Sequence, residues 1–123
     1  MDTEEFDELT EKIIGCAIKV SRFLGPGFLE KVYENALVIE LQRAALFVEQ
    51  QKPLNVFYDG QVVGHYCADI VVEENVLLEL KAIRAIEDAH QAQVLNYLKT
   101  TGLEIGLILN FGTPRLGIKR LRY

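Results

Sequence analysis

The chain has 123 residues, of which 50% are hydrophobic and 25% are charged, and its formal net charge is −5. This composition predicts one compact domain over residues 1–123 and excludes a disordered chain or a pair of domains. No apolar run is long enough to cross a bilayer, and the acidic N-terminus lacks the features of a secretory signal, so we expect a cytoplasmic protein with no membrane partner.

The charge and the cysteines restrict the function classes further. Cys16 and Cys67 lie far apart in apolar-patterned segments, and with two histidines in the chain we expect buried free thiols and no zinc site. A negative net charge argues mildly against tight, free-standing DNA binding. The charge is uneven, however, because residues 1–10 hold five acids and no base, whereas residues 114–123 hold four bases and no acid.

The first part of the chain is predicted to be helical. A helix is expected from about Asp7 or Thr10 to Phe23, and Gly25-Pro26-Gly27 ends it. A second helix is expected over residues 28–45. The residues expected to face inward from these helices are Leu9, Ile13, Cys16, Ala17, Val20, Leu29, Val32, Tyr33, Ala36, Leu37 and Leu41.

Strands and one more helix follow. A hairpin turn is expected at Asp59-Gly60, and a helix over residues 87–101, with Ala92, Leu95 and Leu98 facing inward, stops at Gly102. The expected strands are residues 54–58, 61–72, 76–82, 105–110 and 117–121. Antiparallel strands followed by a helical crossover predict an α/β fold with a mixed sheet flanked by helices.

Residues 68–81 predict a second hairpin whose polar side chains share one face. With a three-residue turn at 73–75, Val72 pairs with Val76 and Asp69 lies across from Glu79. Lys81 shares the face of Glu79, because side chains alternate along a strand. Val71 and Leu77 lie on this face too, whereas the opposite face carries Ala68, Ile70, Val72, Val76, Leu78 and Leu80.

Two interpretations of this hairpin are open. Asp69 and Glu79 could bind Mg²⁺ through carboxylate oxygens, with Lys81 beside a phosphate. Alternatively, the face is solvated, and Glu79 and Lys81 form simple charge pairs. The presence of Val71 and Leu77 favours a partly covered face, on which charges need partners.

Two helical motifs carry further candidates. His90, Gln93 and Tyr97 form one stripe on the later helix, which is either a polar surface or a site in which Gln93 orients the lysine or a water and Tyr97 lies near a phosphate. Glu30 and Tyr33 lie one turn apart; a glutamate in a first helical turn and a tyrosine in the core are also ordinary structural features.

These motifs together resemble a known family. Gly27-x-x-Glu30-x-x-Tyr33 is similar to the signature of the GxxExxY proteins, small bacterial and archaeal domains grouped with the PD-(D/E)XK nuclease superfamily. The resemblance extends from about Ile13 to Arg122 and implies a restriction-endonuclease-like core of order α-β-β-β-α-β. Further matching stretches are Gly25–Glu34, Gln51–Pro53, Ala68-Asp69, Glu79–Lys81, His90–Leu98 and Asn110–Gly112.

The resemblance implies roles for individual residues. Asp69, Glu79 and Glu30 would bind Mg²⁺ or Mn²⁺, with the Leu80 carbonyl as a further ligand. Lys81 would position the attacking water. Gln93 and Tyr97 match the Gln-x-x-x-Tyr motif of the RecB-like branch. Ala68 stands where the superfamily name has proline, which makes no metal contact.

The implied activity is metal-dependent phosphodiester hydrolysis of DNA, with RNA as the second choice. The alternative is a non-catalytic module of the same fold that acts as a binding or scaffold part of a nucleic-acid-processing complex. Nucleic acid is the expected partner in both cases. A domain this small also predicts a homodimer or a larger complex.

Overall fold

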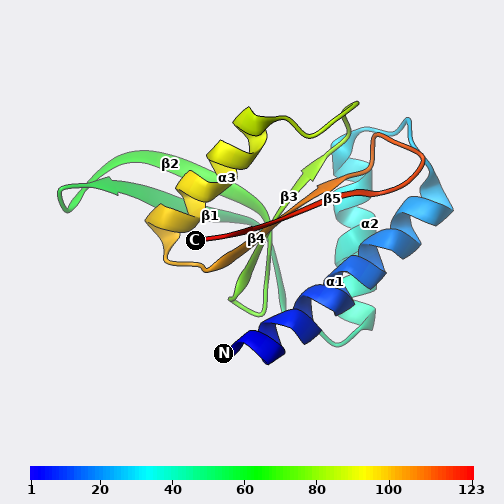
Figure 1. The fold of residues 1–123 in the computed structure, drawn as a ribbon, viewed down its shortest axis with the longest axis horizontal. Coiled ribbons are helices and arrows are strands. Elements are labelled where there is room, and N and C mark those ends of the chain that lie inside the picture. Colours follow the sequence, from blue (N-terminus) through cyan, green and yellow to red (C-terminus); the bar gives the residue numbers. More distant parts are fainter.

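The computed structural model describes residues 1–123 and shows one sheet with helices on both faces (Figure 1). Its elements are α1 (Thr3–Leu24), α2 (Glu30–Arg43), β1 (Val48–Tyr58), β2 (Gln61–Val72), β3 (Val76–Lys81), α3 (Asp88–Thr101), β4 (Ile105–Asn110) and β5 (Gly117–Arg122). The strand order is β1-β2-β3-β4-β5, and all neighbours are antiparallel except β3 and β4, which α3 connects as a parallel crossover. The predicted mixed α/β fold is confirmed. None of the helices has the length and hydropathy needed to span a bilayer.

Alternation along the central strands gives the sheet two apolar faces. Leu78 and Leu80 of β3 pack in a cluster with residues of α1 and α2, whereas Leu77 packs with Val94 and Leu98 of α3. Figure 1 shows α3 separated from α1 and α2 by the sheet. Glu79 follows Leu77 in the same alternation, so its side chain points to the α3 face.

The β1–β2 hairpin extends beyond the rest of the sheet (Figure 1). Its ladder runs to the pair Tyr58–Gln61, and Asp59 and Gly60 form the turn with φ values of 51° and 76°. Two consecutive positive φ angles are typical of a type I′ turn, which matches the strand twist. The predicted hairpin turn is confirmed.

Two predicted boundaries were wrong. The first helix begins at Thr3, because the Asp2 carboxylate accepts a hydrogen bond from the Glu5 N–H at 2.9 Å and the Glu5 carboxylate accepts one from the Asp2 N–H at 3.4 Å. The first strand begins at Val48, six residues before the predicted start. Residues 49–53 have no apolar alternation, and they are a strand because they pair with β2.

Several side chains expected to be buried are not. Leu29 is 81% exposed because it is the N-cap residue of α2, and Val32 is 40% exposed. The buried stripe of α2 follows Tyr33, Leu37 and Leu41, and that of α3 follows Val94 and Leu98, which leaves Ala92 exposed.

The cysteines and Ala68 also differ from expectation. Both thiols are free as predicted, but Cys16 is half-buried and Cys67 is exposed. Cys67 lies where β2 has already left β3, so one face of the strand has no cover. In the same part of β2, Ala68 packs in the α3 cluster and not on the face of Ile70.

We expect Gly106→Ala to destabilise the fold by about 1–3 kcal/mol. A Cβ at Gly106 would lie 2.8 Å from Val94 Cγ1, and a β-branched side chain on a helix has little freedom to move away. Gly15→Ala is the matched control, because no atom lies within 4 Å of a Cβ there and alanine favours a helix by about 0.5–1 kcal/mol. Urea unfolding should therefore show that the free energy of unfolding falls in Gly106→Ala and rises in Gly15→Ala. Changes of the same sign in both variants would contradict the packing of α3 on β4.

Candidate functional site

The β2–β3 hairpin has the predicted register and then opens at the candidate site. Val72 pairs with Val76, and the ladder continues to Ile70–Leu78, where it ends. At the next position the Asp69 side chain accepts the hydrogen bond in place of the backbone, because the Leu80 N–H donates to Asp69 Oδ2 at 2.9 Å. The carboxylate thus replaces a strand carbonyl at the point where the two strands separate.

Glu79 lies at the same end of the hairpin and is tied to α3 through two tyrosines. Its carboxylate is 8% exposed and accepts a hydrogen bond from the Tyr66 hydroxyl of β2. The ring of Tyr66 stacks on that of Tyr97, with centroids 3.4 Å apart and an interplanar angle of 16°. Gln93 is exposed and lies one turn before Tyr97 on α3. Of the predicted helical residues, Tyr97 is therefore connected to Glu79 through Tyr66.

His90, the third residue of that predicted stripe, has a different role. The Glu87 N–H donates to His90 Nδ1 at 2.9 Å, which closes a capping box at the start of α3. This contact satisfies a backbone donor that the helix leaves free, so His90 stabilises the helix start.

The α2 helix brings two acids to the opposite side of Asp69. Glu30 is exposed in the first turn, and Glu34 is buried one turn later. Glu34 accepts hydrogen bonds from Gln51 Nε2 at 2.9 Å and from Gln50 Nε2 at 2.6 Å, and it pairs with Lys31 at 2.9 Å. Gln51 Nε2 also lies 3.5 Å from Asp69 Oδ1, so an amide of β1 connects the two carboxylates.

Tyr33 holds the start of α2 against the end of β3. Its hydroxyl donates to the Gly25 carbonyl at 2.6 Å and accepts from the Phe28 N–H at 3.1 Å. Its ring stacks on Phe111 with centroids 4.8 Å apart, and the Phe111 N–H donates to the Lys81 carbonyl at 2.8 Å. Through these contacts, the loop that precedes Glu30 is fixed relative to the backbone of Lys81.

Three residues of this cluster were missed from the sequence: Glu34, Gln51 and Tyr66. Glu34 shares the helix face of Glu30 at i, i+4 spacing, which was an available signal. Gln51 was missed because its strand was predicted to begin at residue 54. Tyr66 had no signal of its own, since its contact with Glu79 depends on the tertiary position of both strands.

The carboxyl groups of the cluster raise one another's pKa. Burial, and then the charge of Asp69, raise the pKa of Glu79 to about 7, although Tyr66 and Lys81 act in the opposite direction. Burial also raises the pKa of Asp69, with Glu34 adding to it and the Leu80 N–H opposing it. Although Glu30 is exposed, partial desolvation raises its pKa first, and the charges of Asp69 and Glu34 add to this while Lys81 opposes it.

This donor set fits a hard divalent cation in its chemistry. Asp69 and Glu79 offer carboxylate oxygens, and Mg²⁺ usually binds proteins through one or two carboxylates and fills its remaining positions with water and phosphate oxygens. No group of three or more Asp, Glu, His or Cys side chains converges tightly enough to hold an ion. Two carboxylates, those of Asp69 and Glu79, are the number that a protein usually offers to Mg²⁺. Glu30 does not form a three-carboxylate group with them.

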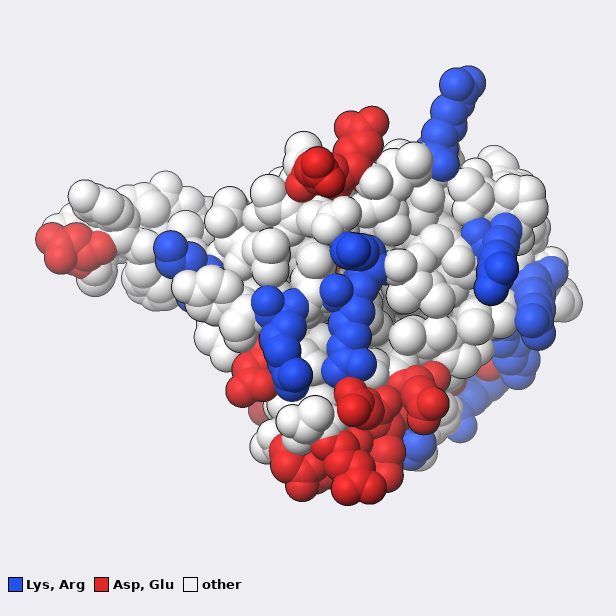
Figure 2. All heavy atoms as spheres, in the orientation of Figure 1, with Lys and Arg blue, Asp and Glu red and all other residues white.

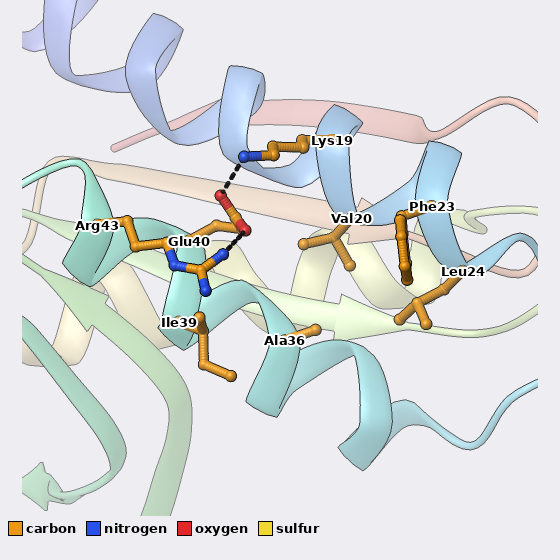
Figure 3. A pocket seen from close by; sticks show the side chains of 8 residues that line it. All are labelled: Lys19, Val20, Phe23, Leu24, Ala36, Ile39, Glu40 and Arg43. Carbon is orange, nitrogen blue, oxygen red and sulfur yellow. Dashed lines mark hydrogen bonds and ion pairs between the residues drawn. The ribbon is translucent and has the colours of Figure 1, made fainter.

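A hollow of about 360 Å³ lies between α1 and α2 (Figure 3). At one end Glu40 pairs with Lys19 at 3.1 Å and with Arg43 at 3.0 Å, and the remaining lining is largely apolar. None of the residues predicted for the site lines it, so it is separate from the acidic cluster.

We expect the fold to lose stability as the pH rises from about 4.5 to 7, and Glu79→Gln to flatten this loss. Glu79 keeps its proton in the folded state up to a pKa of about 7, whereas the unfolded chain releases it near 4.5. Between these values the folded state binds more protons, so its stability falls with rising pH by up to about 3 kcal/mol. Urea unfolding at pH 5 and pH 8 measures both proteins. If the free energy of unfolding changed equally between the two pH values in wild type and variant, Glu79 would not have a raised pKa in the folded protein.

Comparison with known proteins agrees with this fold. A family model described as the PD-(D/E)XK nuclease superfamily matches residues 7–121. Among solved structures, the fold resembles one described as the crystal structure of SSO0001, with a TM-score of 0.60 and 17% identity over 76% of this chain and 50% of that one. This chain therefore spans about half the length of that protein, and the likeness is one of fold. No curated protein matches the chain significantly.

Proposed function

The chain belongs to the PD-(D/E)XK nuclease superfamily, and from that membership we propose that it hydrolyses phosphodiester bonds of DNA with Mg²⁺ or Mn²⁺; RNA is the second choice. One observation carries this proposal: Asp69 and Glu79 lie on adjoining strands where the ladder opens, and Lys81 follows on the face of Glu79. Within the superfamily, we place the chain with the GxxExxY proteins and the RecB-like branch on the strength of its motifs.

Asp69 and Glu79 would hold the metal, with the Leu80 carbonyl as a further oxygen donor. A divalent ion supplies Lewis-acid stabilisation of the phosphate and acidifies a bound water. Burial raises the pKa of both carboxyl groups, and the charge of Asp69 raises that of Glu79 further. A bound cation would favour the charged form of each, which supports this assignment.

The other residues act on the water and the phosphate. Lys81 orients the attacking water and offsets charge at the scissile phosphate. Tyr97 supports the ring of Tyr66, whose hydroxyl donates to the Glu79 carboxylate. We expect the phenol of Tyr97 to lie near the substrate phosphate. Gln93 is exposed beside Tyr97 and steadies the lysine or the substrate.

We expect the purified protein to cleave single-stranded, double-stranded or branched DNA in Mg²⁺ or Mn²⁺. Asp69→Ala and Lys81→Ala should each lower the rate by about 100-fold or more, because each removes a charge that acts on the reacting phosphate. Asp59→Ala at the hairpin tip and Lys99→Ala on α3 are controls that change the net charge equally on exposed side chains. No cleavage of any nucleic acid would overturn the nuclease function, and activity that survives in both site variants would overturn the residue assignment.

A non-catalytic scaffold is the second candidate, and the contact between Tyr66 and Glu79 favours it. That hydrogen bond occupies one oxygen of the Glu79 carboxylate that a metal would need. In addition, no three acidic side chains converge on one point.

Calorimetric titration with Mn²⁺ distinguishes the two functions. We expect one binding site that is lost in Asp69→Ala and in Glu79→Ala and kept in Glu74→Ala, which removes an exposed carboxylate from the β2–β3 turn. The absence of metal binding by the wild-type protein would support the scaffold.

A further inference from the structure

Four basic side chains surround two neighbouring hollows beside the β4–β5 loop. Arg84 and Lys119 line a hollow of about 290 Å³, and Arg22 and Arg115 line one of about 410 Å³. Ile118 lies between the two hollows and lines both, and no aspartate or glutamate lines either. We call these four side chains the basic track.

The basic track is not neutralised by the protein. None of its four side chains has a carboxylate within 4.0 Å, whereas Arg120 and Arg122 on the same strand, β5, pair with Asp7 at 2.7 Å and Glu104 at 3.8 Å. The net charge of the chain is −5, so uncompensated cations that gather in one place are a specific feature. Figure 2 shows acidic side chains over the N-terminal part of α1 and basic ones over its C-terminal end and the β3–α3 loop.

Backbone contacts fix the Arg84 end of the basic track relative to the candidate site. Arg84 lies three residues after Lys81, in a loop that Asn110 of β4 fixes: Asn110 Oδ1 accepts from the Ile83 N–H at 3.0 Å, and Asn110 Nδ2 donates to the Ile83 carbonyl at 2.9 Å. Gly112 lets this loop approach, since a Cβ there would lie 2.3 Å from the Ile83 backbone. The position of Arg84 relative to Lys81 is therefore set by backbone contacts.

We propose that the basic track binds the phosphate backbone of a nucleic acid that extends from the candidate site. Arginine and lysine bind phosphate through charge-assisted hydrogen bonds, and neutralising phosphates releases counterions from the nucleic acid. Gln91 and Thr113 line the first hollow and add neutral donors. This inference rests on the proposed function, because the nearby acidic cluster is what selects a phosphodiester polymer over another polyanion.

The test compares two double variants with the same change of net charge. Arg84→Gln/Lys119→Gln removes half of the basic track, and Arg120→Gln/Arg122→Gln removes two paired cations from the same strand. Binding to a labelled 20-base-pair DNA duplex is followed by fluorescence anisotropy over a range of salt concentrations. EDTA is present, so that metal-dependent cleavage cannot occur.

The track variant should bind DNA at least about 10-fold more weakly, and its slope of log affinity against log salt should be smaller by about 2, since each phosphate contact contributes about 0.9. The control should change by less than about 3-fold. An RNA duplex of the same sequence distinguishes the two sources of phosphate. The basic track binds the kind of duplex for which the track variant loses affinity relative to the wild-type protein. Equal losses in both variants, tighter binding to polyglutamate than to either duplex, or no binding by the wild-type protein would overturn the proposal.

This result is separate from that of the cleavage assay. Binding that depends on the track without any cleavage would leave the basic track in place and contradict the nuclease function. Cleavage with equal binding by the two double variants would contradict the track alone. Unfolding in urea checks that both variants fold, because exposed substitutions of this kind should leave the midpoint nearly unchanged.

Discussion

The hydrogen bond from the Leu80 N–H to the Asp69 carboxylate is the contact on which the candidate site depends. The β2–β3 ladder ends one pair earlier, and beyond this point β2 continues with β1 as a separate hairpin. A strand that leaves its neighbour exposes an unpaired backbone donor, which is costly where water has little access. Asp69 satisfies that donor with one oxygen and leaves the other near Gln51 and the remaining acids.

The second constraint is that acids from both faces of the sheet approach Asp69 without converging on one point. Glu79 lies on the α3 side, held by Tyr66, whereas Glu30 and Glu34 come from α2, which covers the opposite face. The stacked pair of Tyr33 and Phe111 joins the start of α2 to the end of β3. These supports hold like charges close together at a cost in stability. Such a cost is common at functional sites, where strained electrostatics serve binding or catalysis.

The sequence predicted the part of this arrangement that depends on local patterns. The register of residues 68–81 was predicted from alternation and a three-residue turn, and the structure has the predicted pairs from Val72–Val76 to Ile70–Leu78. The predicted pair Asp69–Glu79 lies beyond the end of this ladder. The first strand was predicted too short because its polar start is held by pairing with β2 and not by its own pattern. Tyr66 was not predicted because its partner Glu79 is thirteen residues away in the sequence. Burial of Cys67 was wrongly expected because no periodicity indicates where β2 separates from β3.

The central claim is that Asp69 and Glu79 share one divalent ion, and a crystal structure of the protein with Mn²⁺ tests it most directly. In such a structure the anomalous signal of the metal should lie within about 2.0–2.4 Å of an oxygen from each carboxylate, and the Tyr66 hydroxyl should no longer donate to the oxygen of Glu79 that binds the metal. A Glu79 carboxylate still bonded to Tyr66, with no metal peak beside Asp69 at saturating Mn²⁺, would contradict the claim.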